Sequence, residues 1–237
     1  MPAPHCYINA AQIVVFSPSI AATLKADLLH SSLLAQLLAD KAAFTTLSDW
    51  HHRYTSALAR TQWMRMSATV HSITPDEPVV TLTEMIDASS LPSSAKAMLR
   101  HTLDALRQPA NASALSILRN AVCKPHDGLP SHNLWFELVQ VTDASDIRTF
   151  ALTVEAPGAA LTPDTSDHVF DTMPEGARFT LRTSQFELMP TYDGIRTKVI
   201  RALGDKANRY TAVVESSHDM PPVPKPSVPA LDNFTVR

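Results

Sequence analysis

The distribution of glycine is the feature that most constrains the fold of this chain. The first 127 of its 237 residues contain no glycine, and all five glycines follow, at positions 128, 158, 176, 194 and 204. Glycine is disfavoured inside helices, and it is useful in turns that need a positive φ. The pattern therefore predicts an α+β protein, in which a helix-rich region, residues 1–127, packs on or beside an antiparallel, β-sandwich-like region, residues 128–219.

Hydrophobic periodicity predicts a strand and then a helix at the start of the chain. Residues 7–16 contain the β-branched run Ile13, Val14, Val15, which is typical of a strand. The leucines of residues 17–42 cover so wide an arc of a helix that this helix should be buried. We expect it to begin near residue 17.

A second helix is predicted from a cap at Ser48 as far as Trp63. Trp50, Tyr54 and Trp63 would then share one face of this helix, which could line a ligand groove. Core packing is the favoured interpretation, because large side chains at helical spacing usually bury against a neighbouring element.

Two prolines bound a third helix. Pro92 should open it and Pro109 should end it, before a short fourth helix capped by Asn111. His101 and Asp104 lie one turn apart in this third helix, where an exposed pair contributes only tenths of a kcal/mol. We expect no catalysis there.

Twofold alternation of apolar residues replaces the helical period after residue 130. Strands are predicted at residues 134–141, 148–155, 177–188, 195–203 and 209–216. Both faces of the first should be buried, and the first two should form a hairpin. Residues 195–203 also fit a helix capped by Asp193 and ended by Gly204.

The charge balance excludes some classes of protein. The chain has 20 basic and 23 acidic residues, scattered rather than clustered, which argues against nucleic-acid binding. No run of about 18 uncharged apolar residues predicts a membrane span. The start of the sequence does not look like an export signal, so we expect a cytoplasmic protein, with export by another route left open.

The junction of the two regions holds the densest set of reactive side chains: Cys123, His126, Asp127 and His132. A thiol beside an imidazole can act as a nucleophile, so a hydrolase or transferase site here is one hypothesis. Zinc binding would need a second ligand pair, which is missing, so we expect no metal or other cofactor. A polar connector is favoured, because the chain also lacks the glycine-rich motifs of common nucleotide-binding and hydrolase sites.

An acidic group in a predicted loop could in principle hold calcium: Asp164, Asp167, His168 and Asp171. Its spacing lacks the glycine and the final glutamate of an EF-hand loop. A solvated loop is therefore the preferred interpretation.

A proline-rich arm, residues 220–237, ends the chain. Its prolines and one lysine have the Pro-x-x-Pro spacing of segments that bind aromatic grooves: Pro221, Pro222, Pro224, Lys225, Pro226 and Pro229. Alternatively, the arm is a stiff spacer that carries residues 233–236 to the chain's own sheet or to a neighbouring subunit.

These patterns favour a non-enzymatic binding or assembly component that acts through protein–protein contacts, with a protein partner or by self-association. The alternatives are an enzyme with its site at the junction, or reversible membrane association through the leucine-rich first helix.

Overall fold

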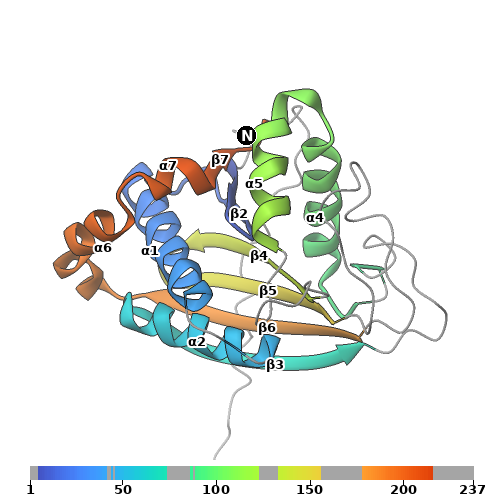
Figure 1. The fold of residues 1–237 in the computed structure, drawn as a ribbon, viewed down its shortest axis with the longest axis horizontal. Coiled ribbons are helices and arrows are strands. Elements are labelled where there is room, and N and C mark those ends of the chain that lie inside the picture. The colour runs from blue at the N-terminus through green and yellow to red at the C-terminus, as the bar shows by residue number, and fades with distance from the viewer. Residues whose placement is uncertain are drawn as a thin grey trace, which may run out of the picture.

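The computed structural model describes residues 5–41, 44, 46–73, 86–87, 89–122, 133–155 and 178–215. Its strands form one seven-stranded sheet in the order β3-β6-β5-β4-β2-β1-β7 (Figure 1). The strands are β1 (His5–Asn9), β2 (Gln12–Phe16), β3 (Trp63–Ile73), β4 (Asn133–Asp143), β5 (Asp146–Glu155), β6 (Arg178–Leu188) and β7 (Thr211–Val213). Neighbouring strands are antiparallel except for the parallel pair β2 and β4.

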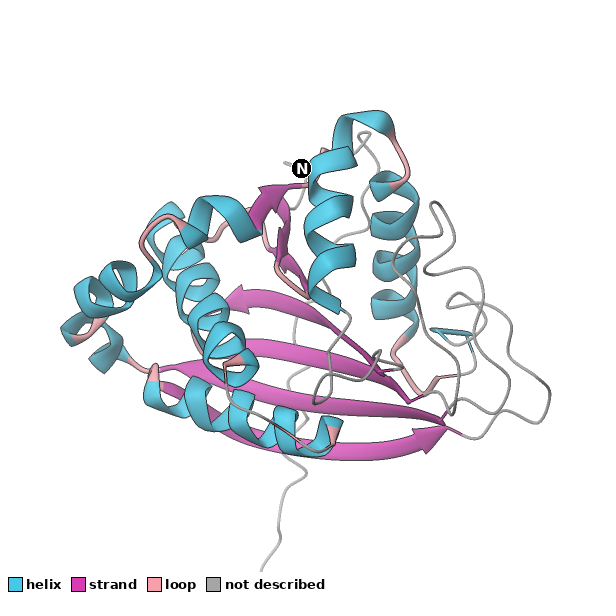
Figure 2. Cartoon of the chain, in the orientation of Figure 1, coloured by secondary structure: helices cyan, strands magenta, loops and turns pink. Residues whose placement is uncertain are grey.

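Helices make up most of the remaining described chain (Figure 2). They are α1 (Ala22–Asp40), α2 (Leu47–Arg60), α4 (Ser93–Leu106), α5 (Ala112–Val122), α6 (Arg196–Leu203) and the short α7 (Lys206–Tyr210), with 3₁₀ turns η1 (Pro109–Asn111) and η3 (Pro190–Gly194). The α+β class is therefore confirmed.

Helices cover both faces of the sheet. Gln12 and Glu137 lie side by side on β2 and β4, and Gln12 donates a hydrogen bond to Tyr54 of α2. Gln140, three residues along β4, points to the opposite face, where its amide lies 3.5 Å from the sulfur of Met98 on α4. Helices therefore occupy both faces of the sheet, whereas in a sandwich one face would pack against a second sheet. The described strands form one sheet and not the two sheets of the expected sandwich.

The first half of the chain contributes three strands to this sheet, and the second half contributes α6 and α7. Two of the three strands in the first half follow turns at non-glycine residues. Ala10 and Gln62 adopt positive φ values of 53° and 66° in these turns. Ala10 turns the chain from β1 into β2, and Gln62 turns it from α2 into β3. Positive φ usually indicates glycine, so a sequence without glycine at these positions did not predict the hairpin of β1 and β2 or the turn from α2 into β3.

The first helix is buried as predicted, although it begins later. Leu33 is fully buried, but α1 starts at Ala22 because the backbone first turns, with the amide of Ile20 bonded to the carbonyl of Ser17. The second helix is capped by Thr46, whose hydroxyl accepts a hydrogen bond from the Asp49 amide, and not by Ser48.

The second helix also ends earlier than predicted. It stops at Arg60, and the turn at Gln62 places Trp63 at the start of β3. Trp50, Tyr54 and Trp63 are at most 3% exposed, which confirms core packing over a groove.

Several predictions about the later elements are confirmed, and others are wrong. The predicted hairpin is formed by β4 and β5, and α4 begins after Pro92. Residues 195–203 mostly form the helix α6, ended by Gly204 at φ 56°, so the strand interpretation was wrong. Asn111 is not free to cap α5, because its amide bonds to the backbone of Ala105 and Glu215.

Candidate functional site

Among the described strands, β3 forms one edge of the sheet and pairs only with β6. Residues 64–72 are all exposed, on both faces of the strand. Three of their apolar side chains are strongly exposed: Met64 at 41%, Met66 at 55% and Val70 at 57%. Its outer side therefore presents backbone amide and carbonyl groups to any strand that approaches.

The start of β3 is firmly held in the core. The indole of Trp63 donates a 2.8 Å hydrogen bond to the hydroxyl of Ser31 on α1 and packs edge-on against Phe186 of β6. The carbonyl of Gln62 accepts a hydrogen bond from the amide of Met189. The exposed strand is thus anchored in the core at its first residue and pairs with β6 along its length.

Natural proteins protect sheet edges with lysine, proline, bulges or short strands. In β3, the protection is confined to one end, where Arg65 supplies a charge and a bulge interrupts the register between Arg65 and Ser67. Residues 67–73 contain neither proline nor a charged Lys, Arg, Asp or Glu. The opposite edge, β7, is only three residues long. Of the two edges of the described sheet, that of β3 is therefore the longer and the less protected.

A buried polar cluster lies between the sheet and helices α1 and α2. At its centre, Oε2 of Glu137 accepts hydrogen bonds from Gln12 at 2.7 Å and from the Tyr54 hydroxyl at 2.8 Å. The amide of Gln36 on α1 donates to Gln12 at 3.0 Å, and Asn9 donates to Ser32 of the same helix at 2.9 Å. The cluster thus joins both helices to strands β1, β2 and β4.

Burial dominates the electrostatics of this cluster. It raises the pKa of Glu137 to about 7, although hydrogen bonds from Gln12, Tyr54 and Thr149 act in the opposite direction. The pKa of Tyr54 is also raised, first by burial and then by Glu137. Glu137 is only 1% exposed, and Trp50 and Trp135 pack beside Tyr54. The closed arrangement suits a structural role and gives a substrate no access.

His51 lies at the border of this cluster, on α2. Burial, followed by the positive charges of Arg182 and Arg65, lowers its pKa to about 4. Its Nδ1 atom is buried and has no hydrogen-bond partner among the residues that the structure describes. The imidazole is therefore neutral at physiological pH and cannot supply a proton there.

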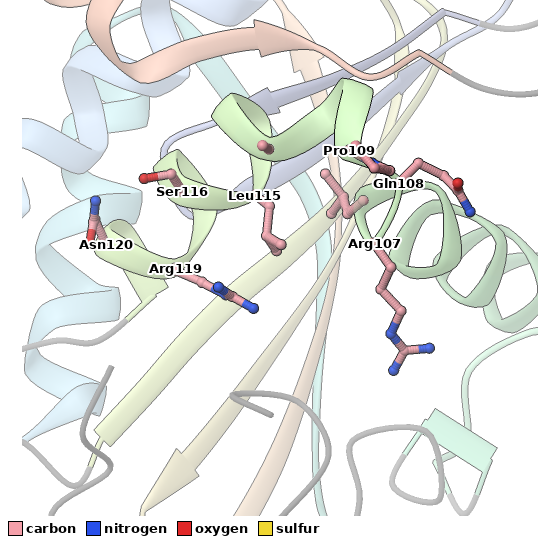
Figure 3. A pocket seen from close by; sticks show the side chains of 9 residues that line it. Arg107, Gln108, Pro109, Leu115, Ser116, Arg119 and Asn120 are labelled. Atoms are coloured by element: carbon pink, nitrogen blue, oxygen red, sulfur yellow. The ribbon is translucent and has the colours of Figure 1, made fainter. Parts of the chain in front are cut away.

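A hollow of about 430 Å³ lies beside the corner between α4 and α5 (Figure 3). The side chains around it are Leu106, Arg107, Gln108, Pro109, Ala112, Leu115, Ser116, Arg119 and Asn120. None of these residues was a candidate from the sequence, because their spacing matches no binding motif.

The sequence candidates for chemistry fall outside the described residues. This holds for Cys123, His126, Asp127 and His132, for the acidic group around Asp164, and for the proline-rich arm. The junction enzyme and the arm contact therefore stay predictions. His101 and Asp104 do not pair in the structure, because Asp104 bonds to Arg107 at 3.0 Å.

In the described part of the chain, no three His, Cys, Asp or Glu side chains gather as metal ligands. The helices described there include none long and apolar enough to cross a membrane. Cys6 is a free, buried thiol whose pKa burial raises to about 12, so it is a poor nucleophile.

No protein-family model matches the chain, and no curated protein matches it. Among solved structures, it is similar to the Evf virulence factor, with 10% identity, a TM-score of 0.30, and coverage of 86% of this chain and 80% of that one. It is also similar to a delta-endotoxin, with 10% identity, a TM-score of 0.31, and coverage of 80% and 86%. TM-scores this low support no statement about fold or function.

Proposed function

We propose that this protein is a non-enzymatic assembly component that binds a second copy of itself through the edge of β3. The observation that carries the proposal is the exposure of residues 64–72 in an 11-residue edge strand that, within the described part of the chain, is paired on one side only. Strand addition supplies backbone hydrogen bonds whatever the side chains are, so such an edge is a ready binding surface.

The sequence of β3 supports a second copy as the partner. In an antiparallel pair centred on Thr69, this residue faces its own equivalent, Ala68 faces Val70, and Ser67 faces His71. These pairings bring together no Lys, Arg, Asp or Glu, and cross-strand threonine pairs are favourable. A twofold axis through Thr69 makes the interface self-complementary, as closed dimers require.

The experiment is light scattering over a concentration series of the full chain. The unmodified protein should show a dimer mass that falls on dilution. Val70→Lys should shift the protein to monomer, because two introduced lysines would lie close together across the twofold axis.

Val213→Lys is the matched control, since Val213 is equally exposed, at 59%, but lies on the opposite edge. This variant should dimerise like the unmodified protein. A monomer mass for the unmodified protein at every concentration would refute the proposal, as would dimers that persist in Val70→Lys.

A further inference from the structure

Basic side chains from three elements come together where α2 packs against the edge of the sheet. They are His51 on α2, Arg65 on β3 and Arg182 on β6. The charges of Arg182 and Arg65 both act on His51, so the three side chains lie close to one another. Figure 1 shows α2 running along β6 and β3. The cluster therefore lies at the border of the helix layer and is shared by α2 and two strands.

Strand alternation places both arginines on the face of the sheet that α1 and α2 cover. Trp63 of β3 packs edge-on against Phe186 of β6 and bonds to Ser31 of α1, which identifies this face. Arg65 follows Trp63 by two residues, and Arg182 precedes Phe186 by four, so each arginine shares the face of its neighbour. Both arginine side chains therefore extend to the side of the sheet from which His51 approaches.

The sheet itself offers these two arginines no polar neighbour. In the strand register, Arg65 lies opposite Phe186, and Arg182 lies between Val70 and Ala151. All three of these neighbours are apolar and supply neither an acceptor nor an opposite charge. Among the described residues, neither arginine forms an ion pair or a side-chain hydrogen bond. Their guanidinium groups are therefore available to a ligand.

Two nitrogen atoms of the cluster are buried without a partner. Nδ1 of His51 and Nε of Arg182 both lack a hydrogen bond to any described residue. Burial also lowers the pKa of Arg182, and the charge of Glu155 acts in the opposite direction without forming an ion pair. Buried donors are almost always paired in proteins, so two unpaired nitrogen atoms in one place require an explanation. The Nε atom is a donor, and an acceptor from a bound molecule would satisfy it.

The charges around His51 favour an anion as that acceptor. The charged groups that act on this imidazole are Arg182, then Arg65, then His52 of its own helix, and each of them disfavours a further positive charge. An anion among them would be attracted by every one of these groups. Because the donors come from a helix and two strands, an acceptor with oxygens in several directions fits better than a planar carboxylate.

We propose that His51, Arg65 and Arg182 bind a tetrahedral oxyanion, a phosphate or sulfate group, at the border between α2 and the sheet. The arginine fork matches the oxygens of such a group, and the imidazole adds a third donor. The site lies on one face of the sheet and not along the outer edge of β3. It therefore goes beyond the assembly role and does not rest on it.

The test is an NMR titration of the histidine side chains of the full chain at pH 7, with ionic strength held constant by sodium chloride. Sulfate should move the His51 signal along a saturable curve with a millimolar Kd, which is reasonable for so small a ligand. Acetate should bind at least about tenfold more weakly. Phenyl phosphate distinguishes the two sources of the group, because tighter binding than sulfate indicates a phosphate ester and weaker binding indicates a free ion.

An internal control is His71 of β3. It is exposed, and alternation from Val70, which lies opposite Arg182, places His71 on the other face of the strand. Its signal should therefore change little when sulfate saturates the signal of His51.

The protonation of His51 provides a second measurement. Its pKa is lowered to about 4, first by burial and then by the positive charges around it. A bound dianion favours the imidazolium, so saturating sulfate should raise this pKa by about one unit or more. By linkage, sulfate should bind about tenfold more tightly to the protonated form.

Two variants and one control locate the site. Arg65→Gln and Arg182→Gln should each weaken sulfate binding about tenfold. Arg201→Gln removes the same charge from an exposed position on α6 and should leave binding unchanged. Circular dichroism checks that each variant is folded. Arg65 is exposed, so its replacement tests the site even where Arg182→Gln disturbs the sheet.

Four results would overturn the proposal. They are the absence of a saturable shift of His51, an unchanged His51 pKa in saturating sulfate, acetate binding as tightly as sulfate, and equal losses in Arg65→Gln and Arg201→Gln.

Discussion

The hydroxyl group of Tyr54 on α2 donates a 2.8 Å hydrogen bond to Glu137, a carboxyl group buried in the centre of the sheet. Gln12 of β2 donates to the same oxygen, and Thr149 of β5 also bonds to the carboxyl group. Burial nevertheless raises its pKa to about 7, because the lost hydration outweighs these hydrogen bonds. The protonation state of Glu137 therefore couples the packing of α2 against the sheet to pH.

Replacement of Glu137 by glutamine should stabilise the protein at pH 8 and change the pH dependence of unfolding. A folded-state pKa above the unfolded value favours the protonated native state, so stability is highest below about pH 4.5 and falls as pH rises toward 7. The shift corresponds to about 3 kcal/mol, as an order of magnitude. Glu137→Gln should remove most of this decline.

The measurement is urea unfolding of both proteins from pH 4.5 to pH 8. Glu187→Gln, on the partly exposed side of β6, is the control and should retain the decline. Parallel pH profiles for the unmodified protein and Glu137→Gln would contradict the assignment of this decline to Glu137.

Removal of the Tyr54 hydroxyl should also change the protonation equilibrium of Glu137. Tyr54→Phe deletes a donor that favours the charged carboxylate, so the pKa of Glu137 should rise further. The decline in stability should still begin near pH 4.5 but should extend to a higher pH, and the free energy of unfolding should fall by about 1–3 kcal/mol at pH 5. Unfolding over the same pH range measures both effects, with Tyr210→Phe on α7 as the control. A decline that ends at a lower pH in Tyr54→Phe than in the unmodified protein would count against the hydrogen bond.

The buried face of α1 should not tolerate a charge. Leu33 is 0% exposed, so Leu33→Asp should destabilise the protein by several kcal/mol, about 3 or more, through an unpaired buried carboxylate. Leu38 lies on the same helix at 41% exposure, and Leu38→Asp should cost less than about 1 kcal/mol. Thermal unfolding compares the two. Equal melting temperatures would mean that α1 is exposed in solution, which would favour the membrane hypothesis.

The carboxamide of Asn111 should anchor the end of the described chain. It is 1% exposed, donates to the carbonyls of Ala105 and Glu215, and accepts from the Glu215 amide. Asn111→Ala should cost about 1–3 kcal/mol and speed amide hydrogen exchange at Glu215, because the backbone groups of Ala105 and Glu215 lose their bonds to the carboxamide. Asn208→Ala, an exposed change on α7, should do neither. Unchanged exchange at Glu215 would argue against this anchor.

Local patterns predicted the long helices and the hairpin because those elements depend on neighbouring residues. The leucines of α1, the prolines around α4 and the alternation along β4 and β5 all act over short distances. The single sheet was not predictable in this way. It depends on β2 pairing with β4, more than 100 residues away, and on Ala10 adopting a backbone conformation that usually indicates glycine.

The edge strand β3 was likewise not predicted from local patterns. The helical spacing of Trp50 and Tyr54 continues by chance to Trp63, so the strand β3 was partly assigned to a helix. The β-spaced pair Ala68 and Val70 was a weak signal for that strand. Residues of α4 and α5 line one hollow because η1 turns the chain between the two helices.

The sheet order also determines when the strands can pair during synthesis. The strand β3 ends at residue 73, but its partner β6 begins at residue 178, so about 100 residues emerge from the ribosome before β3 has a neighbour. Until then, both of its edges are unpaired, and such edges promote aggregation of incomplete chains. Because β2 likewise waits for β4, and β1 for β7, the sheet forms largely through distant contacts and should fold slowly for a protein of this helix content.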